Sequence, residues 1–129
     1  MILDSSAVVA ILLKEPPCDT LLDHLNRSAS RRIGTPTLAE TGIVLSARLG
    51  ILGKTLLARF VAEADLKAAP FSDRHWQVAI GAYQRFGKRR HPANLNFGDC
   101  LTYATARLAS EPLLCVGDDF AQTDLPLVQ

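Results

Sequence analysis

The sequence predicts an α/β fold in which helices cover a parallel sheet, and three observations lead to this prediction. Short apolar runs such as Ile2–Leu3 and Leu113–Val116 are bounded by turn residues, which is typical of buried strands. Apolar residues at helical spacing fill the longer segments between these runs. Helices and strands also alternate along the chain, as they do when strands pair in parallel. At 129 residues the chain is expected to form one domain, residues 1–129.

Each expected element is delimited by a cap, a turn or a helix breaker. Ser72 marks the clearest helix start, because Phe71 and Trp76 have the spacing of a hydrophobic staple around it. Gly50 is placed to end one helix and Gly87 another. The predicted helices are 7–13, 18–30, 36–49, 52–64, 72–87 and 96–110, and the predicted strands are 2–3, 31–36, 66–71, 113–116 and 127–128.

The composition excludes several classes of protein. Hydrophobic residues make up 48% of the chain and charged residues 21%, which argues against disorder. The formal net charge is +1, so a nucleic-acid partner must be held by a local basic patch. No apolar run approaches the length of a membrane span, and no secretory signal is expected. The three cysteines lack metal-ligand spacing, which suggests reduced thiols and a cytoplasmic protein.

Asp4 stands at the end of the first predicted strand, where the chain turns into a helix. Ligands of open α/β sheets bind at this carboxyl edge. A buried carboxylate there costs free energy unless it is paired or holds a cation. The alternative is that Asp4 simply caps the helix, a role that Ser5 or Ser6 could also take.

Glu40 is the one acid that lies within an apolar helical stripe. It shares a helix face with Ile43 and Val44, which should turn its side chain inward. A capping box between Thr37 and Glu40 explains the same residue without any site.

The remaining acids stand at two other element junctions. Asp99 falls in the first turn of its helix, where Asn96 can cap and the helix dipole favours an acid. Asp118 and Asp119 follow the last strong strand, although they could be plain turn residues. If that strand is parallel to the first, both lie on the same sheet edge as Asp4.

Four carboxylates that converge at one edge would repel one another. The Coulomb energy of one pair about 4 Å apart is ~4 kcal/mol at an effective dielectric constant of about 20. Such a cluster either binds protons or holds a divalent cation. Because only oxygen ligands are on offer, the cation would be Mg²⁺ or Mn²⁺ rather than Zn²⁺. Carboxylates with Mg²⁺ in turn make phosphate the natural substrate group.

The acids stand in four recognisable segments of the chain: Ile-Leu-Asp-Ser-Ser-Ala7, Thr-Leu-Ala-Glu-Thr41, Leu-Asn-Phe-Gly-Asp-Cys100 and Leu-Leu-Cys-Val-Gly-Asp-Asp-Phe120. Together these segments resemble a PIN domain and, more narrowly, the VapC toxins of bacterial VapBC toxin–antitoxin pairs. No single motif is specific, but the set spans essentially the whole chain in the right order. The resemblance implies a PIN-like three-layer α/β/α sandwich with a central parallel sheet.

The resemblance also implies the members of the site. Asp4 and Asp99 would be direct metal ligands, and Glu40 with a fourth acid would bind a second ion or orient water. Family members place an acid directly before the Phe, which points to Asp119, and Asp118 is the alternative. Ser6 matches a family hydroxyl that lies beside the metal, and helix capping is the competing explanation.

The function that the resemblance implies is that of a toxin in a type II toxin–antitoxin system. The protein would be a Mg²⁺-dependent endoribonuclease, with Mn²⁺ as a possible substitute, that cuts transfer RNA or a ribosomal RNA loop. A cognate VapB-type antitoxin would inhibit it, and the chain would form a homodimer without any membrane association.

One basic run leads directly into the Asp99 helix. Lys88, Arg89 and Arg90 form its centre, with Arg85 and His91 at its ends. The run is predicted to contact the RNA backbone beside the acidic site. The competing interpretation is a solvated, mobile loop.

Three other classes of protein fit the sequence less well. A haloacid-dehalogenase-like phosphatase needs Asp-x-Asp, and residue 6 is Ser. A receiver domain needs an acid after a middle strand, and none follows one between Arg32 and Glu63. A degenerate PIN domain could serve as an RNA- or protein-binding module, although all four acids are present.

Overall fold

A computed structural model describes residues 1–129 and contains a four-stranded parallel sheet with six α-helices. The strands lie in the order β3-β2-β1-β4, so the chain leaves the central strand β1 in one direction and returns on its other side. The strands are β1 (Ile2–Leu3), β2 (Arg32–Gly34), β3 (Lys67–Ala69) and β4 (Leu113–Leu114). The helices are α1 (Ser5–Leu12), α2 (Cys18–Arg27), α3 (Thr35–Leu49), α4 (Leu52–Glu63), α5 (Asp73–Phe86) and α6 (Phe97–Ala109), and a 3₁₀ turn covers Phe120–Gln122.

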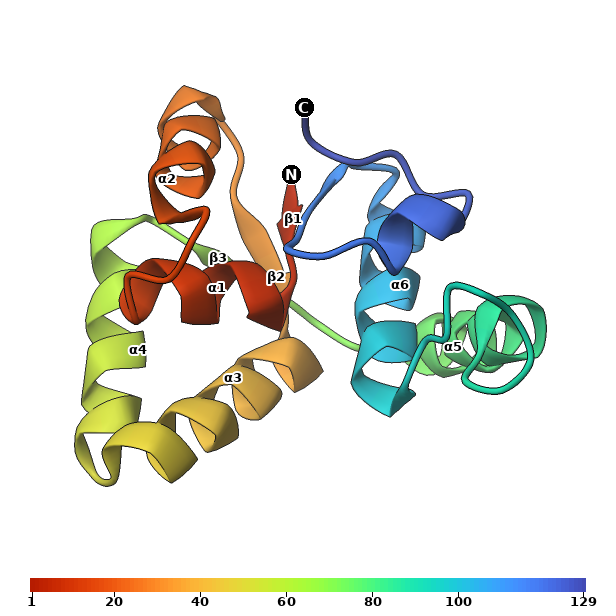
Figure 1. Cartoon of the computed structure of the whole chain (residues 1–129), viewed down its shortest axis with the longest axis horizontal. Coiled ribbons are helices and arrows are strands. Elements are labelled where there is room, and N and C mark those ends of the chain that lie inside the picture. Colours follow the sequence, from red (N-terminus) through yellow and green to blue (C-terminus); the bar gives the residue numbers. More distant parts are fainter.

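Two hydrophobic cores lie on opposite faces of the sheet, which confirms the predicted three layers. Successive residues of a strand point to opposite faces, and Leu3 accordingly packs in the core beneath α1, α2 and α4 while Ile2 packs beneath α5 and α6. Leu114 and Leu113 divide in the same way. In Figure 1, α1 to α4 lie on one side of the strands, with α5 and α6 on the other. None of the helices is both long and apolar enough to cross a membrane.

The sheet has its topological switch point between β1 and β4. β1 pairs with β2 on one side and with β4 on the other, and Ile2 is in register with Arg32 and with Leu113. In open parallel sheets the crevice at the carboxyl ends of such strands is the usual ligand position. Here that crevice receives Asp4 after β1 and the segment from Cys115 onward after β4.

Several predicted boundaries were wrong, and each has a local cause. Asp4 caps α1, so Ser5 and Ser6 lie inside the helix rather than capping it. The helix predicted from residue 36 begins at Thr35 with Gly34 as its N-cap, so no capping box joins Thr37 and Glu40. The predicted strand 127–128 reduces to one bridge between residues 113 and 127.

The start of α5 also differs in detail from its prediction. Ser72 is the N-cap as expected, but its partner is His75, whose Nδ1 accepts the Ser72 backbone N–H at 3.1 Å. Phe71 lies against the His75 ring, with 5.1 Å between ring centroids, and Trp76 remains half exposed. Trp76 is therefore a surface residue of α5 and not one arm of a staple.

Candidate functional site

Asp4 is a buried carboxylate with defined partners at the carboxyl end of β1. Only 4% of the residue is exposed. The Asp4 Oδ2 atom accepts the backbone N–H of Ser6 at 3.1 Å and the Ser6 hydroxyl at 2.6 Å. The Ser6 hydroxyl oxygen in turn accepts the backbone N–H of Val116 at 3.0 Å. Asp4 thus caps α1, and Ser6 joins it to the segment that follows β4.

Asp99 lies three residues after Asn96, the expected N-cap of α6, and the charges of the other acids act on it. Its Oδ2 accepts the Asn96 N–H at 3.0 Å, and its own N–H donates to Asn96 Oδ1 at 2.9 Å. Burial raises the pKa of Asp99 to about 6; the Asn96 hydrogen bond opposes this shift, and the negative charges of Asp4, Asp119 and Glu40 add to it. The Asp99 carboxyl therefore takes part in the capping box of α6 and is also affected by the charges of the other acids.

Glu40 reaches the same region from α3 and is half-buried. Burial raises the pKa of its carboxyl, the Ser5 hydroxyl opposes this shift, and the charge of Asp4 adds to it. The carboxylate lies directly against Gly98, in the first turn of α6, where a Cβ atom would stand 2.9 Å from Glu40 Cδ. No local sequence pattern marks Gly98, because its role depends on Glu40, which is remote in the sequence.

The fourth acid is exposed, and the surrounding groups distinguish the two candidates. Burial raises the pKa of the Cys115 thiol to about 12, and the charges of Asp4, Asp99 and Asp119 contribute. Asp119 also contributes to the raised pKa of Asp99, whereas Asp118 contributes to neither. The charge of Asp119 therefore acts on this end of the sheet, and Asp119 remains the predicted fourth acid. Cys115, which stays a neutral thiol there, is a neighbour of the acids and not a nucleophile.

The donor set of this crevice suits a hard divalent cation, although the side chains do not form a closed cage. No group of three or more His, Cys, Asp or Glu side chains is close enough to hold a metal ion together. All four acids offer oxygen alone, which Mg²⁺ and Mn²⁺ prefer, and Mg²⁺ usually keeps several waters in its shell. Convergence of the four carboxylates on one ion remains a prediction.

The basic run forms a loop that the backbone closes at its base. Lys88 N–H donates to the Leu95 carbonyl at 2.9 Å, and Leu95 N–H donates to the Phe86 carbonyl at 2.9 Å. Leu95 is fully buried, while Lys88, Arg89 and Arg90 are exposed. The three cations therefore stand on an anchored loop.

The outer residues of the basic run have other partners. Arg85 donates to Asp124 at 3.1 Å and to the hydroxyl of Tyr103 at 3.4 Å, so it anchors the C-terminal segment. His91 Nδ1 accepts the Ala93 N–H at 3.0 Å within the loop. The three central cations form no salt bridge, and the Arg90 guanidinium lies over the Tyr83 ring, 5.1 Å from its centroid.

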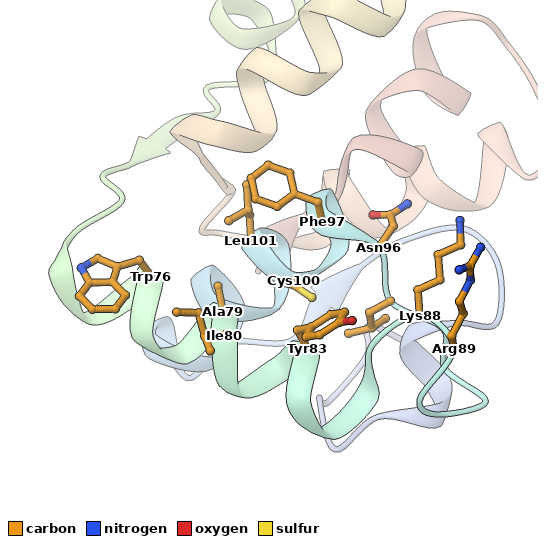
Figure 2. A pocket seen from close by; sticks show the side chains of 11 residues that line it. Trp76, Ala79, Ile80, Tyr83, Lys88, Arg89, Asn96, Phe97, Cys100 and Leu101 are labelled. Carbon is orange, nitrogen blue, oxygen red and sulfur yellow. The ribbon is translucent and has the colours of Figure 1, made fainter.

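An apolar groove of about 640 Å³ lies between α5 and the start of α6. Trp76, Ile80 and Tyr83 line it from α5, and Phe97 and Leu101 line it from α6. Figure 2 shows Lys88 and Arg89 at one end of this groove, beside Asn96. The groove therefore runs from an exposed apolar surface toward the cap residue of the Asp99 helix.

A parallel sheet with acids at its switch point agrees with the family to which the sequence is matched. The family model for the PIN domain matches residues 1–125, and the chain is therefore a PIN domain protein.

Relatives define the group more narrowly. The ribonuclease VapC36 of Mycobacterium tuberculosis is 48% identical over 126 residues, which cover 97% of this chain and 91% of that protein. The chain belongs to the VapC ribonucleases, and the predicted family, fold class and enzyme class, a ribonuclease toxin, are confirmed.

Solved structures support the fold at low sequence identity. VapC20 of Mycobacterium tuberculosis, described as a sarcin–ricin loop cleaving toxin, has a TM-score of 0.80 at 16% identity and covers 99% of this chain and 98% of its own. A chain of a toxin–antitoxin complex from Klebsiella pneumoniae has a TM-score of 0.73 at 14% identity and covers 98% and 95%.

The raised pKa of Asp99 predicts how its replacement changes stability with pH. Without metal at pH 7.5, the free energy of unfolding of Asp99→Asn should exceed that of the wild type by up to about 2 kcal/mol after solvent screening, so the variant should unfold at a higher temperature. The sign follows from linkage: a carboxyl whose pKa rises on folding loses its stabilising contribution as pH rises through about 6. The difference should therefore become small below the unfolded pKa of about 3.9.

Thermal unfolding between about pH 3.5 and pH 8 with a chelator present measures this effect. Asp118→Asn is the matched control, because Asp118 is exposed and does not contribute to the pKa of Asp99. An equal, pH-independent rise in melting temperature in both variants would show that folding does not raise the pKa of Asp99.

Proposed function

We propose that this ribonuclease uses Asp4, Glu40, Asp99 and Asp119 to hold Mg²⁺, or Mn²⁺, and cuts a structured RNA, either a transfer RNA or a ribosomal RNA loop. The observation that supports this most is the pKa of Asp99, on which the charges of the other three acids act together. The acids belong to four separate segments, which follow β1, lie in α3, begin α6 and follow β4. We further propose that residues 1–129 form a single PIN domain.

The residues have distinct parts in the proposed reaction. Asp4 and Asp99 would be direct ligands, and Glu40 and Asp119 would hold a second ion or accept a hydrogen bond from the attacking water. Ser6 fixes the Asp4 carboxylate through a 2.6 Å hydrogen bond, so the oxygen that remains points in a constant direction. Mg²⁺, when bound, supplies a Lewis acid that neutralises phosphate charge and promotes deprotonation of water. No histidine is needed as a base.

RNA cleavage with variants of neighbouring acids tests this proposal. Asp99→Asn and Asp119→Asn should each reduce the cleavage rate by at least about 100-fold, because a lost metal contact removes stabilisation of the transition state. Asp118→Asn should cleave as the wild type does. Mn²⁺ should raise the melting temperature of the wild type and of Asp118→Asn, and raise that of Asp99→Asn much less.

Sequencing of RNA ends after brief induction in cells identifies the substrate in the same set of variants. Wild-type ends that are equally abundant with Asp99→Asn would overturn the assignment of the site. If the pure protein binds RNA but never cleaves it with Mg²⁺ or Mn²⁺, the chain is a degenerate PIN domain that acts as a binding module.

We propose that Lys88, Arg89 and Arg90 hold the RNA backbone. The loop is anchored by buried Leu95 and lies just before the Asp99 helix, and all three cations are exposed. Since the net charge of the chain is only +1, backbone binding must be concentrated in such a patch.

Replacing all three cations with Ala should weaken RNA binding and flatten its salt dependence, by about 0.7 to 0.9 in the logarithmic slope per lost contact. The matched control replaces three exposed cations elsewhere, Arg27, Lys54 and Arg74, with the same change in net charge. The affinity for RNA is measured at several salt concentrations. A loop variant with the slope of the control would place the RNA path elsewhere.

We propose a homodimer whose interface includes the apolar groove. Phe97 is 81% exposed and Ile80 50% exposed, and Trp76 and Tyr83 continue the stripe on α5. An exposed apolar surface of this kind favours a protein partner. Phe97 immediately precedes Gly98 and Asp99, so two copies joined here would bring two acidic sites near a shared groove.

Ile80→Glu should convert the dimer to a monomer in analytical ultracentrifugation, because a charge would be buried without a partner. Ile51→Glu is the control, since Ile51 is 90% exposed in the α3–α4 turn and distant in sequence from the groove. A wild-type protein that sediments as a monomer at all concentrations would exclude the homodimer.

We propose a VapB-type antitoxin as the inhibitor, encoded beside the gene of this chain, and the cytoplasm as the compartment. The Klebsiella structure is, by its description, a toxin–antitoxin complex of the same fold. A Lys or Arg of the antitoxin would find opposite charge at the acidic crevice. The free cysteines, Cys18, Cys100 and Cys115, suit a reducing compartment.

A further inference from the structure

The close contact with Glu40 explains why residue 98 is a glycine, because its backbone conformation does not require one. Gly98 lies in the first turn of α6, and its φ is not in the left-handed region. A glycine inside a helix costs about 1 kcal/mol relative to Ala. A Cβ atom at this position would lie 2.9 Å from Glu40 Cδ and 3.1 Å from Glu40 Oε1. The Glu40 carboxylate therefore occupies the space that a side chain at position 98 would need.

The contact between Glu40 and Gly98 is the last in a row of three close approaches between α6 and the segment that runs from Gly34, the N-cap of α3, into α3. At one end, a Cβ on Gly34 would lie 2.7 Å from Thr105 Oγ1. In the middle, the hydroxyls of Thr37 and Thr102 are 3.1 Å apart and fully shielded from solvent.

The two helices advance through this row in opposite directions. Positions 34, 37 and 40 on one side face 105, 102 and 98 on the other, which is one helical turn per step. Small residues let the backbones approach closely, and the last step brings the Glu40 carboxylate to the turn that carries Asp99.

We infer that Gly98 is a positioning residue, which leaves room for the Glu40 carboxylate against the first turn of α6 and so fixes its place beside Asp4 and Asp99. This inference rests on the proposed function, because it assigns Glu40 its place in the proposed metal site. The N-terminal turn of a helix favours a nearby carboxylate. A methyl group at position 98 would force the carboxylate away without breaking the fold, since the clashing atoms end a flexible side chain.

The central experiment is Gly98→Ala, with Gly81→Ala as its matched control. Gly81 lies in α5, and a Cβ there would meet nothing within 4 Å. Gly98→Ala should lower kcat for RNA cleavage by about 10- to 100-fold, since a small displacement of a catalytic group has effects of this size. The KM for RNA should change much less. Gly81→Ala should leave both constants unchanged.

Metal binding supplies a readout that does not depend on catalysis. The Mn²⁺ concentration that gives half of the maximal rise in melting temperature should increase about tenfold in Gly98→Ala. In a Glu40→Ala background the same substitution should change this concentration no further, because no carboxylate remains to be displaced. An unchanged midpoint and kcat in Gly98→Ala would overturn the inference. So would a loss that persists in the Glu40→Ala background.

The metal-free proteins separate failure of this inference from failure of the proposed function. Gly98→Ala should raise the melting temperature in the Glu40→Ala background about as much as Gly81→Ala does, and by less when Glu40 is present. If the wild type neither cleaves RNA nor responds to Mn²⁺, the proposed function fails while this comparison still tests the contact. Equal gains in both backgrounds would show that the two residues do not constrain one another.

Discussion

The hydrogen bonds of the buried Asp4 carboxylate determine how three segments meet at the edge of the sheet. Asp4 ends β1 and caps α1, and Ser6 links its Oδ2 to the backbone N–H of Val116 after β4. A polar group that is buried without hydrogen-bond partners costs free energy, so these bonds let the fold keep Asp4 at this buried position. Because the Ser6 link reaches the Val116 segment, it also helps to place Asp119 further along the chain.

Much of the fold was predictable because its signals are local. Apolar runs ended by polar residues marked β1 and β4, and the Asn96 cap marked the start of α6 correctly. Alternation along a strand then required two cores, since Ile2 and Leu3 must face opposite sides. The positions of Asp4 and Asp99 followed from the same signals, because both acids stand where one element ends and the next begins.

The remaining features depend on partners that are remote in sequence. The local sequence allows Thr37 to cap its own helix, but Thr37 lies inside α3, buried, with its hydroxyl 3.1 Å from that of Thr102 on α6. Gly98 carried no signal, because its significance comes from Glu40, on another helix. The choice between Asp118 and Asp119 likewise depends on how the chain turns after β4, which adjacent identical residues cannot reveal.

The hydrogen bonds of Asp4 and Asp99 have a consequence for which cation the crevice can select. In each carboxylate, one oxygen is already engaged by backbone or hydroxyl donors, at Asp4 by Ser6 and at Asp99 by Asn96. The engaged oxygen of Asp4 already accepts two hydrogen bonds, which leaves its second oxygen for a further partner, whereas the engaged oxygen of Asp99 accepts only one and keeps a free lone pair. Ca²⁺ is usually held by six to eight oxygens with bidentate carboxylates, whereas Mg²⁺ accepts one or two carboxylates and retains its waters. An ion held as proposed would therefore meet a single free oxygen at Asp4, a contact that suits Mg²⁺ better than Ca²⁺.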